Sequence, residues 1–173
     1  VGAGAWHEPS GRAKRNLGDC MTQTIPPRED YRPLGQRMLA AIMFTDVAGF
    51  SRLMGEHEER TMKAMARDLR LIMNLCEEAK GRVLKVMGDG VLGLFHSAVQ
   101  AVECAREIQS QLAENARTLP VEEVLHHRIG IHLGDVYVHE NEVMGEGVNI
   151  AARLQTEAPP GGICISQALH EVV

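Results

Sequence analysis

Beyond residue 36, hydrophobic and polar positions recur with the periods of regular secondary structure. Residues 38–44 form a continuous apolar run that ends at Thr45 and Asp46. Such a run is expected of a strand buried on both faces. Apolar residues then recur three and four positions apart, which predicts an amphipathic helix that ends before Gly81. The residues of this apolar face are Met62, Met65, Leu69, Ile72, Cys76 and Ala79.

A hairpin and a second helix are predicted next. Residues 82–87 and 91–95 have the composition of strands, and they flank the segment Gly88-Asp89-Gly90. An Asp-Gly pair between two apolar runs is a strong hairpin signal. The second amphipathic helix follows this hairpin, and its apolar face consists of Val102, Ala105, Ile108 and Leu112.

The C-terminal part of the chain predicts shorter elements. Residues 128–133 alternate as strand residues do, and residues 139–141 resemble a turn. A helix over 148–155, a strand over 162–165 and a last helix capped by Ser166 complete the chain. The order β-α-β-β-α-β-(β)-α-β-α predicts an α/β fold, a sandwich of ferredoxin-like type. We expect its helices to lie over one face of a mostly antiparallel sheet.

Residues 1–36 differ from the rest of the chain. They are rich in glycine, proline and charge, and they show no sustained period. Three prolines between Pro26 and Pro33 disfavour a helix there. We interpret this segment as an irregular linker that could join an upstream sensor domain, as the tail of an upstream module, or as a remnant foreign to the domain, and residues 37–173 as the folded domain.

Composition narrows the classes of function. The 173 residues are 45% hydrophobic and 24% charged, which is typical of globular proteins. A net charge of −5 and an aromatic content of 3% argue against a nucleic-acid-binding surface. No apolar run approaches the ~20 residues that span a bilayer. Cys76 and Cys104 fall on the apolar helix faces, which indicates free buried thiols and a reducing, cytoplasmic location.

Two carboxylates are candidates for a metal site. Asp46 follows the first buried strand, and Asp89 lies at the tip of the predicted hairpin. If that strand neighbours the hairpin, both carboxylates can converge on one hard cation such as Mg²⁺ or Mn²⁺. The alternative is that Asp46 caps the following helix and Asp89 only makes the turn.

Other patterns are weaker. Gly88, Gly90 and Gly93 form a literal GxGxxG, but a strand follows them, whereas a dinucleotide fingerprint must begin a helix. Asn149 and Arg153 share one face of the short helix predicted over 148–155, where an amide and a guanidinium can orient a sugar and neutralise a phosphate. Alternatively, both are ordinary solvated residues. His126, His127 and His132 lack metal-like spacing, which favours structural or exposed roles.

Taken in order, these segments resemble the class III nucleotide cyclase catalytic domain, the adenylate/guanylate cyclase family in its bacterial form. The resemblance covers about residues 38–166, through the segments LAAIMFTDVAGFSRLMGEHEE, GRVLKVMGDGVLGLF, HHRIGIHLGDVYV and VMGEGVNIAARLQTEAPPGGICIS. It implies the ferredoxin-like palm of that family. It also implies an adenylate cyclase that converts ATP to 3′,5′-cyclic AMP and pyrophosphate in intracellular signalling.

The resemblance also implies roles for individual residues. Asp46 and Asp89, with the Val47 carbonyl, match the ligands of two divalent ions, Mg²⁺ or Mn²⁺. The other matches concern the nucleotide. Lys85 matches the residue that reads the purine, Asn149 the residue that orients the ribose, and Arg153 the residue that stabilises charge on the transferring phosphate. In this family two domains pair head to tail, so each active site takes its metals from one protomer and Lys85, Asn149 and Arg153 from the other.

Two departures from the family pattern leave alternatives open. Glu142 stands where adenylate cyclases commonly have Asp or Thr to accept a hydrogen bond from the adenine amine, and it is one methylene longer. The chain also ends at Val173, before the strand pair with which the family domain usually continues. The alternatives are a guanylate cyclase, which Lys85 argues against, and a catalytically impaired cyclase-like module that binds nucleotide or regulates a partner.

Overall fold

The computed structural model describes residues 35–173, and these belong to one α/β unit. The predicted linker, residues 1–36, falls almost wholly outside the described residues. The strands are β1 (Gln36–Val47), β2 (Arg82–Met87), β3 (Gly90–Phe95), β4 (His127–His139), β5 (Glu142–Met144) and β6 (Ile163–Ile165). The helices are α1 (Phe50–Glu78), α2 (Ala98–Ala116), the short 3₁₀ turn η1 (Val121–Glu123), α3 (Glu146–Glu157) and α4 (Gln167–His170).

The sheet has six strands in the order β2-β3-β1-β4-β5, and β6 pairs with β4. Neighbouring strands are antiparallel except for the parallel pair β4–β6. β1 is central, with β3 and β4 paired along its two edges, and its residues contribute to a core on each face of the sheet. This position explains its continuous apolar run, of which Ala41, Ile42 and Met43 are fully buried.

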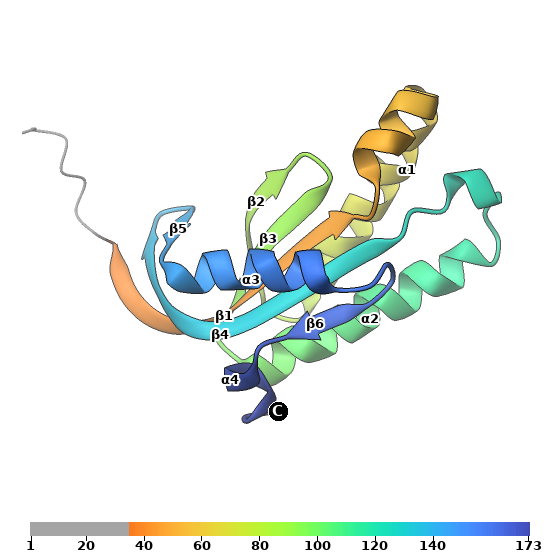
Figure 1. The fold of residues 1–173 in the computed structure, drawn as a ribbon. Coiled ribbons are helices and arrows are strands. Elements are labelled where there is room, and N and C mark those ends of the chain that lie inside the picture. Colours follow the sequence, from red (N-terminus) through yellow and green to blue (C-terminus); the bar gives the residue numbers. More distant parts are fainter. Residues whose placement is uncertain (1–34) are drawn as a thin grey trace, which may run out of the picture. The chain divides into compact units, whose positions relative to one another are not determined.

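Helices cover both faces of the sheet, so the prediction that they lie over one face was wrong. One core joins α1 and α2 to the face that carries Met43 and Phe95. A second, smaller core joins Ala151 of α3 to the opposite face, which carries Ile42 and Leu94. Figure 1 shows α3 on the side of the sheet opposite to α1 and α2. Alternation along β1 supplies both cores, because successive side chains point to opposite faces.

Helix α1 begins earlier than its apolar face predicts. It starts at Phe50 and has non-helical backbone angles at His57 (φ −152°, ψ 73°), so a mostly exposed first segment is joined to the buried one at a kink. Its N-cap residue is Gly49 in the left-handed conformation (φ 72°). Asp46 therefore does not cap this helix, which removes the structural alternative for that residue.

Candidate active site

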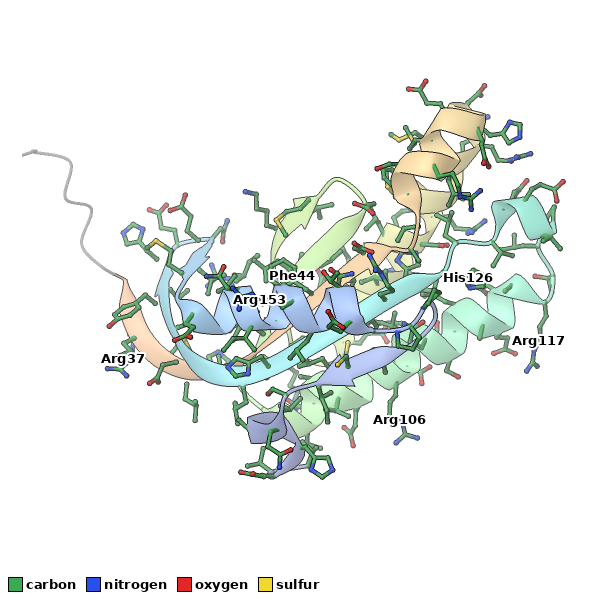
Figure 2. All side chains as sticks on the ribbon, in the orientation of Figure 1. Arg37, Phe44, Arg106, Arg117, His126 and Arg153 are labelled. Carbon is green, nitrogen blue, oxygen red and sulfur yellow. The ribbon has the colours of Figure 1, made fainter. Side chains whose placement is uncertain are left out.

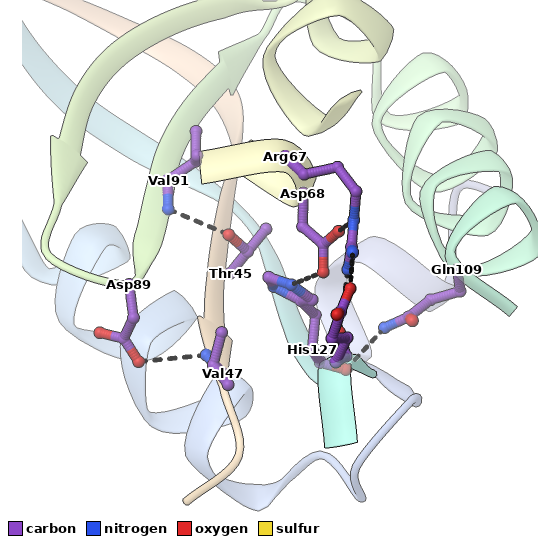
Figure 3. A network of polar contacts seen from close by, with 9 residues as sticks. Thr45, Val47, Arg67, Asp68, Asp89, Val91, Gln109 and His127 are labelled. Atoms are coloured by element: carbon purple, nitrogen blue, oxygen red, sulfur yellow. Dashed lines mark hydrogen bonds and ion pairs between the residues drawn. The ribbon is translucent and has the colours of Figure 1, made fainter. Parts of the chain in front are cut away.

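Asp46 and Asp89 lie at the same end of the sheet. β1 and β3 are antiparallel, with Phe44 opposite Leu92, so the end of β1 lies beside the turn that begins β3. The Asp89 carboxylate accepts a hydrogen bond from the backbone N–H of Val47 at 3.2 Å, one residue from Asp46 (Figure 3). The fold therefore brings these two predicted carboxylates to one place.

The turn that carries Asp89 is pressed against β1. A side chain at Gly90 would lie 1.9 Å from the Thr45 carbonyl oxygen, so only glycine permits this approach. The buried Thr45 hydroxyl accepts a hydrogen bond from the Val91 N–H at 2.9 Å (Figure 3). Thr45 is thus a positioning residue that the sequence pattern did not single out. Its only signal was its place between the apolar run and Asp46.

Arg128 is the second residue that the sequence analysis missed. It lies opposite Asp46 in the β1–β4 register, and its terminal nitrogen donates to both Asp46 carboxylate oxygens at 3.0 Å. The Arg128 Nε also donates to Asp46 Oδ1 at 3.3 Å. Both side chains are partly buried, at 22% and 30% exposure, so this pair is shielded from water more than a surface ion pair. The pair balances the Asp46 charge with a cation from the same chain.

A buried polar network fixes the start of β4 beside this pair. The His127 ring is fully buried, and its Nε2 lies 3.3 Å from Asp68 Oδ2, while Arg67 Nε donates to Asp68 Oδ1 at 2.8 Å. Gln109 of α2 donates to the His127 carbonyl at 2.9 Å (Figure 3). Residue 127 pairs with Val47 in the sheet, so helices α1 and α2 hold the backbone beneath the two carboxylates in place. This geometry fits the structural role expected for His127.

Asn149 and Arg153 lie on the outer side of α3. The buried residues of this helix are Gly147, Ala151 and Gln155, four positions apart. Asn149 and Arg153 each follow a buried residue by two positions, which is about 200° of rotation, and both are exposed. Arg153 extends from α3 in Figure 2. These two predicted residues therefore face away from the sheet that carries Asp46 and Asp89.

Lys85 and Glu142 lie on the two edge segments of the sheet. Lys85 is an exposed residue of β2, and Glu142 is the first residue of β5, on the opposite side of the strand order. Lys85 pairs with Leu92, whose side chain belongs to the core beneath α3. Because paired residues share a face of the sheet, Lys85 lies on the α3 face. Within residues 35–173, the side chain that pairs with Asp46 is Arg128 rather than Lys85.

The chemistry of the donors fits a magnesium-type site. Two carboxylates and the Val47 carbonyl are hard oxygen ligands, and Mg²⁺ commonly takes one or two carboxylates with substrate phosphates in its other positions. Within residues 35–173 no group of three or more His, Cys, Asp or Glu side chains is arranged to enclose a metal. The Arg128 guanidinium already places positive charge on Asp46. The two carboxylates and the carbonyl fit an open site in which other groups would supply the remaining ligands.

Comparison with known proteins identifies the family to which this domain belongs. Residues 36–173 match the family described as the adenylate and guanylate cyclase catalytic domain. A putative adenylate cyclase from Rhizobium meliloti is 45% identical over 139 residues, which is 80% of this chain and 24% of that protein. An adenylate cyclase from Streptomyces coelicolor is 28% identical over 91% of this chain and 40% of its own length. The chain thus spans less than half the length of these relatives.

Solved structures agree with this assignment. An adenylate/guanylate cyclase/hydrolase from Silicibacter pomeroyi is 37% identical, with a TM-score of 0.74 over 79% of this chain and 80% of that one. The guanylyl cyclase Cya2 is 27% identical, with a TM-score of 0.71 over 80% and 79%. The chain belongs to the family of adenylate and guanylate cyclase catalytic domains. The predicted fold class and family are confirmed.

In the part of the chain that the structure describes, no helix has the length and apolar character to cross a membrane.

Proposed function

We propose that this domain is an adenylate cyclase, which closes ATP to 3′,5′-cyclic AMP and releases pyrophosphate. The observation that carries the proposal is the meeting of Asp46 and Asp89 beside the Val47 backbone at the end of β1. An oxygen-rich edge of this kind suits metal-assisted attack of the ribose 3′-hydroxyl on the α-phosphorus. The identity with a putative adenylate cyclase supports the choice of reaction.

Asp46, Asp89 and the Val47 carbonyl would hold the two divalent ions. Mg²⁺ or Mn²⁺, when bound, lowers the pKa of the attacking hydroxyl and stabilises the leaving pyrophosphate. Asp89 keeps one oxygen outside its hydrogen bond to the Val47 amide, so this carboxylate can ligate without losing its support. Arg128 lies beside Asp46 and supplies positive charge where the phosphates would gather.

The remaining residues act from a second copy of the domain. The outward direction of Asn149 and Arg153 supports this proposal, because side chains that face away from their own sheet would reach a nucleotide held by a partner more readily than one held by their own Asp46. The proposed assembly is therefore a head-to-tail homodimer with two shared sites. Arg153 would neutralise charge that develops on the transferring phosphate, which accelerates reaction more than binding of ATP alone would. Asn149 would hold the ribose.

Lys85 and Glu142 would read the base. The Lys85 ammonium donates hydrogen bonds and cannot accept them, whereas guanine presents an N1–H donor that needs an acceptor. Glu142 would accept from the adenine amine. A site built in this way disfavours GTP, because an unpaired buried donor costs more than a good contact gains.

The direct test is a cyclisation assay on the chain with ATP or GTP and Mn²⁺. Cyclic AMP as the main product supports the proposal. Cyclic GMP as the main product would instead make the domain a guanylate cyclase. Nucleotide binding without turnover, at protein concentrations that favour a dimer, would instead favour the regulatory module. Arg106→Ala on the outer side of α2 is a control variant that leaves every proposed site residue in place.

A further inference from the structure

One arginine joins two edges of the sheet that the strand order keeps apart. Arg82 begins β2, and its terminal nitrogen donates to the Glu140 carbonyl at 2.6 Å and to Asn141 Oδ1 at 2.7 Å. Glu140 and Asn141 form the turn between β4 and β5. In a flat sheet, β2 and β5 would be four strand spacings apart, about 19 Å, which one side chain cannot span. The sheet therefore curves enough for the Arg82 side chain to reach the turn between β4 and β5.

The backbone of Arg82 is firmly placed. The preceding Gly81 donates its N–H to the Cys76 carbonyl at 2.7 Å, which ties this position to the end of α1. A side chain at Gly81 would overlap the buried Phe95 ring, at 2.3 Å from the nearest ring carbon. Arg82 itself pairs with Leu94 in the β2–β3 ladder. The exposed Arg82 side chain therefore extends from a backbone position that the sheet and the end of α1 hold in place.

A bulge directs Arg82 to the same face of the sheet as Lys85. Residues three positions apart on a regular strand point to opposite faces. Here the register shifts between Val83 and Lys85, so Arg82 pairs with Leu94 and Lys85 with Leu92. Leu92 and Leu94 both belong to the core beneath α3. Arg82 and Lys85 thus lie on one face because the bulge at Leu84 absorbs the odd residue.

The hairpin on the other side is short. β5 pairs with β4 at only three positions, from Tyr137↔Met144 to His139↔Glu142. Glu140 has a left-handed backbone (φ 52°), which costs a non-glycine residue about 1 kcal/mol. Glu142 comes two residues later, directly after the turn that Arg82 contacts.

We propose that Arg82 is a positioning residue for purine selection. Arg82 holds the Glu140–Asn141 turn, and with it Glu142, at a set distance from Lys85. Lys85 lies on the same strand as Arg82, β2. This inference rests on the proposed function, which gives Lys85 and Glu142 the task of reading the base. Selection between two purines needs donors and acceptors held within about 0.5 Å, and no strand ladder connects β2 to β5.

The experiment compares Arg82→Ala, Arg82→Lys and Asn141→Ala with Arg106→Ala, which removes an exposed arginine from α2 on the other face of the sheet (Figure 2). For Arg82→Ala we expect KM for ATP to rise about threefold to tenfold with kcat within about twofold, because only a charge-assisted positioning contact is lost. The ratio of kcat/KM for ATP to that for GTP should fall by a similar factor. Arg82→Lys should recover part of the loss, and Asn141→Ala should show a smaller one.

Amide hydrogen exchange gives a readout that is independent of turnover. Exchange over residues 139–144 should be faster in Arg82→Ala and unchanged in Arg106→Ala. An active chain in which Arg82→Ala keeps its KM, its nucleotide ratio and its exchange rates would overturn the inference and leave the proposed function intact. A loss confined to kcat would also overturn it. If the wild-type chain cyclises neither nucleotide, the proposed function fails, and the exchange data alone then decide whether Arg82 holds the turn.

Discussion

At the scale of single residues, each carboxylate of the site also has a structural partner. Asp46 pairs with Arg128, and Asp89 accepts from the Val47 N–H. The sequence suggested no such partners, so removal of either side chain was expected to leave the fold largely intact. The structure assigns each contact a modest contribution, since the groups are only partly buried and water can replace the lost partner.

Asp46→Ala and Asp89→Ala should therefore each lower cyclisation by more than about a hundredfold, because the metal ligands are lost. Each should lower the free energy of unfolding by only about 1 kcal/mol. Cyclisation rates with Mn²⁺ and urea unfolding check the two expectations. Asp135→Ala is the matched control, since Asp135 also pairs with an arginine, Arg37, but is exposed and lies outside the site. Wild-type turnover in either site variant would refute the metal assignment.

His132 is a second residue whose surroundings have a measurable consequence. Its ring is buried, its Nδ1 has no hydrogen-bond partner among the described residues, and it packs against Gly147 of α3. Burial lowers the pKa of His132 below its ordinary value of 6.5, and nearby Glu146 only partly opposes this shift. The folded state therefore favours the neutral ring.

The sign of the pH dependence follows from this lowered pKa. The unfolded chain takes up the proton first, so the contribution of His132 to stability is complete above about pH 6.5 and is lost as the pH falls through the lower folded-state pKa. His132→Met should thus make the free energy of unfolding less dependent on pH between about pH 7 and pH 5. Urea unfolding at several pH values measures the slope, and the exposed His126→Met is the control. Equal slopes in wild type and His132→Met would contradict the prediction.

At the scale of elements, the position of α3 depends on a glycine in β4. A side chain at Gly130 would lie 2.1 Å from the Gln155 nitrogen and 2.4 Å from the Ala151 carbonyl oxygen, both backbone atoms of α3. The helix packs directly on the strand here. Asn149 and Arg153 are carried by this helix, so its height above the sheet sets where they lie.

Gly130→Ala should push α3 outward and lower the free energy of unfolding by about 1–3 kcal/mol, the usual cost of overpacking. Gly55→Ala in α1 is the matched control, because nothing lies within 4 Å of its added methyl group and alanine is the better helix former. Thermal and urea unfolding should show a lower free energy of unfolding for Gly130→Ala, and an unchanged or higher one for Gly55→Ala. A Gly130→Ala protein as stable as the wild type would show that α3 can adjust without cost.

At the scale of the whole molecule, the outward direction of Asn149 and Arg153 predicts complementation between inactive chains. Asp46→Ala and Arg153→Ala should each be inactive alone, because every site in either homodimer lacks one essential group. In a mixed dimer one site carries both lesions and the other carries neither. Random pairing makes about half the dimers mixed, so roughly a quarter of wild-type activity should return under two-fold symmetry.

The mixing experiment belongs at high protein concentration, where mass action favours the dimer. The control mixes Asp46→Ala with Asp89→Ala, two lesions on the same half of the site, and this mixture should stay inactive. Activity from a monomer at the full rate, or an Asp46→Ala and Arg153→Ala mixture that stays inactive beside an active wild type, would defeat the shared-site proposal.

The sequence alone determined most of the elements and much of their inward faces. The strand over residues 38–44, the helix face from Met65 to Ala79 and the hairpin around Asp89 appear as predicted, because alternation and helical spacing are local properties that burial enforces. Met62, which was expected on the same helix face, is exposed instead. Ser166 also caps the last helix as expected, accepting from the Leu169 N–H at 3.3 Å. The family resemblance, carried by motifs within these elements, was confirmed for the same reason.

Only the tertiary structure decided which distant residues meet. Arg128 reaches Asp46 through the β1–β4 register, and Arg82 reaches the Glu140–Asn141 turn through the curvature of the sheet. No pattern in one segment encodes either contact, since each depends on how strands far apart in sequence align and twist. The placement of α3 on the second face of the sheet was missed for the same reason. A helix's apolar stripe shows that it packs, whereas the chain's path through space decides on which face it packs.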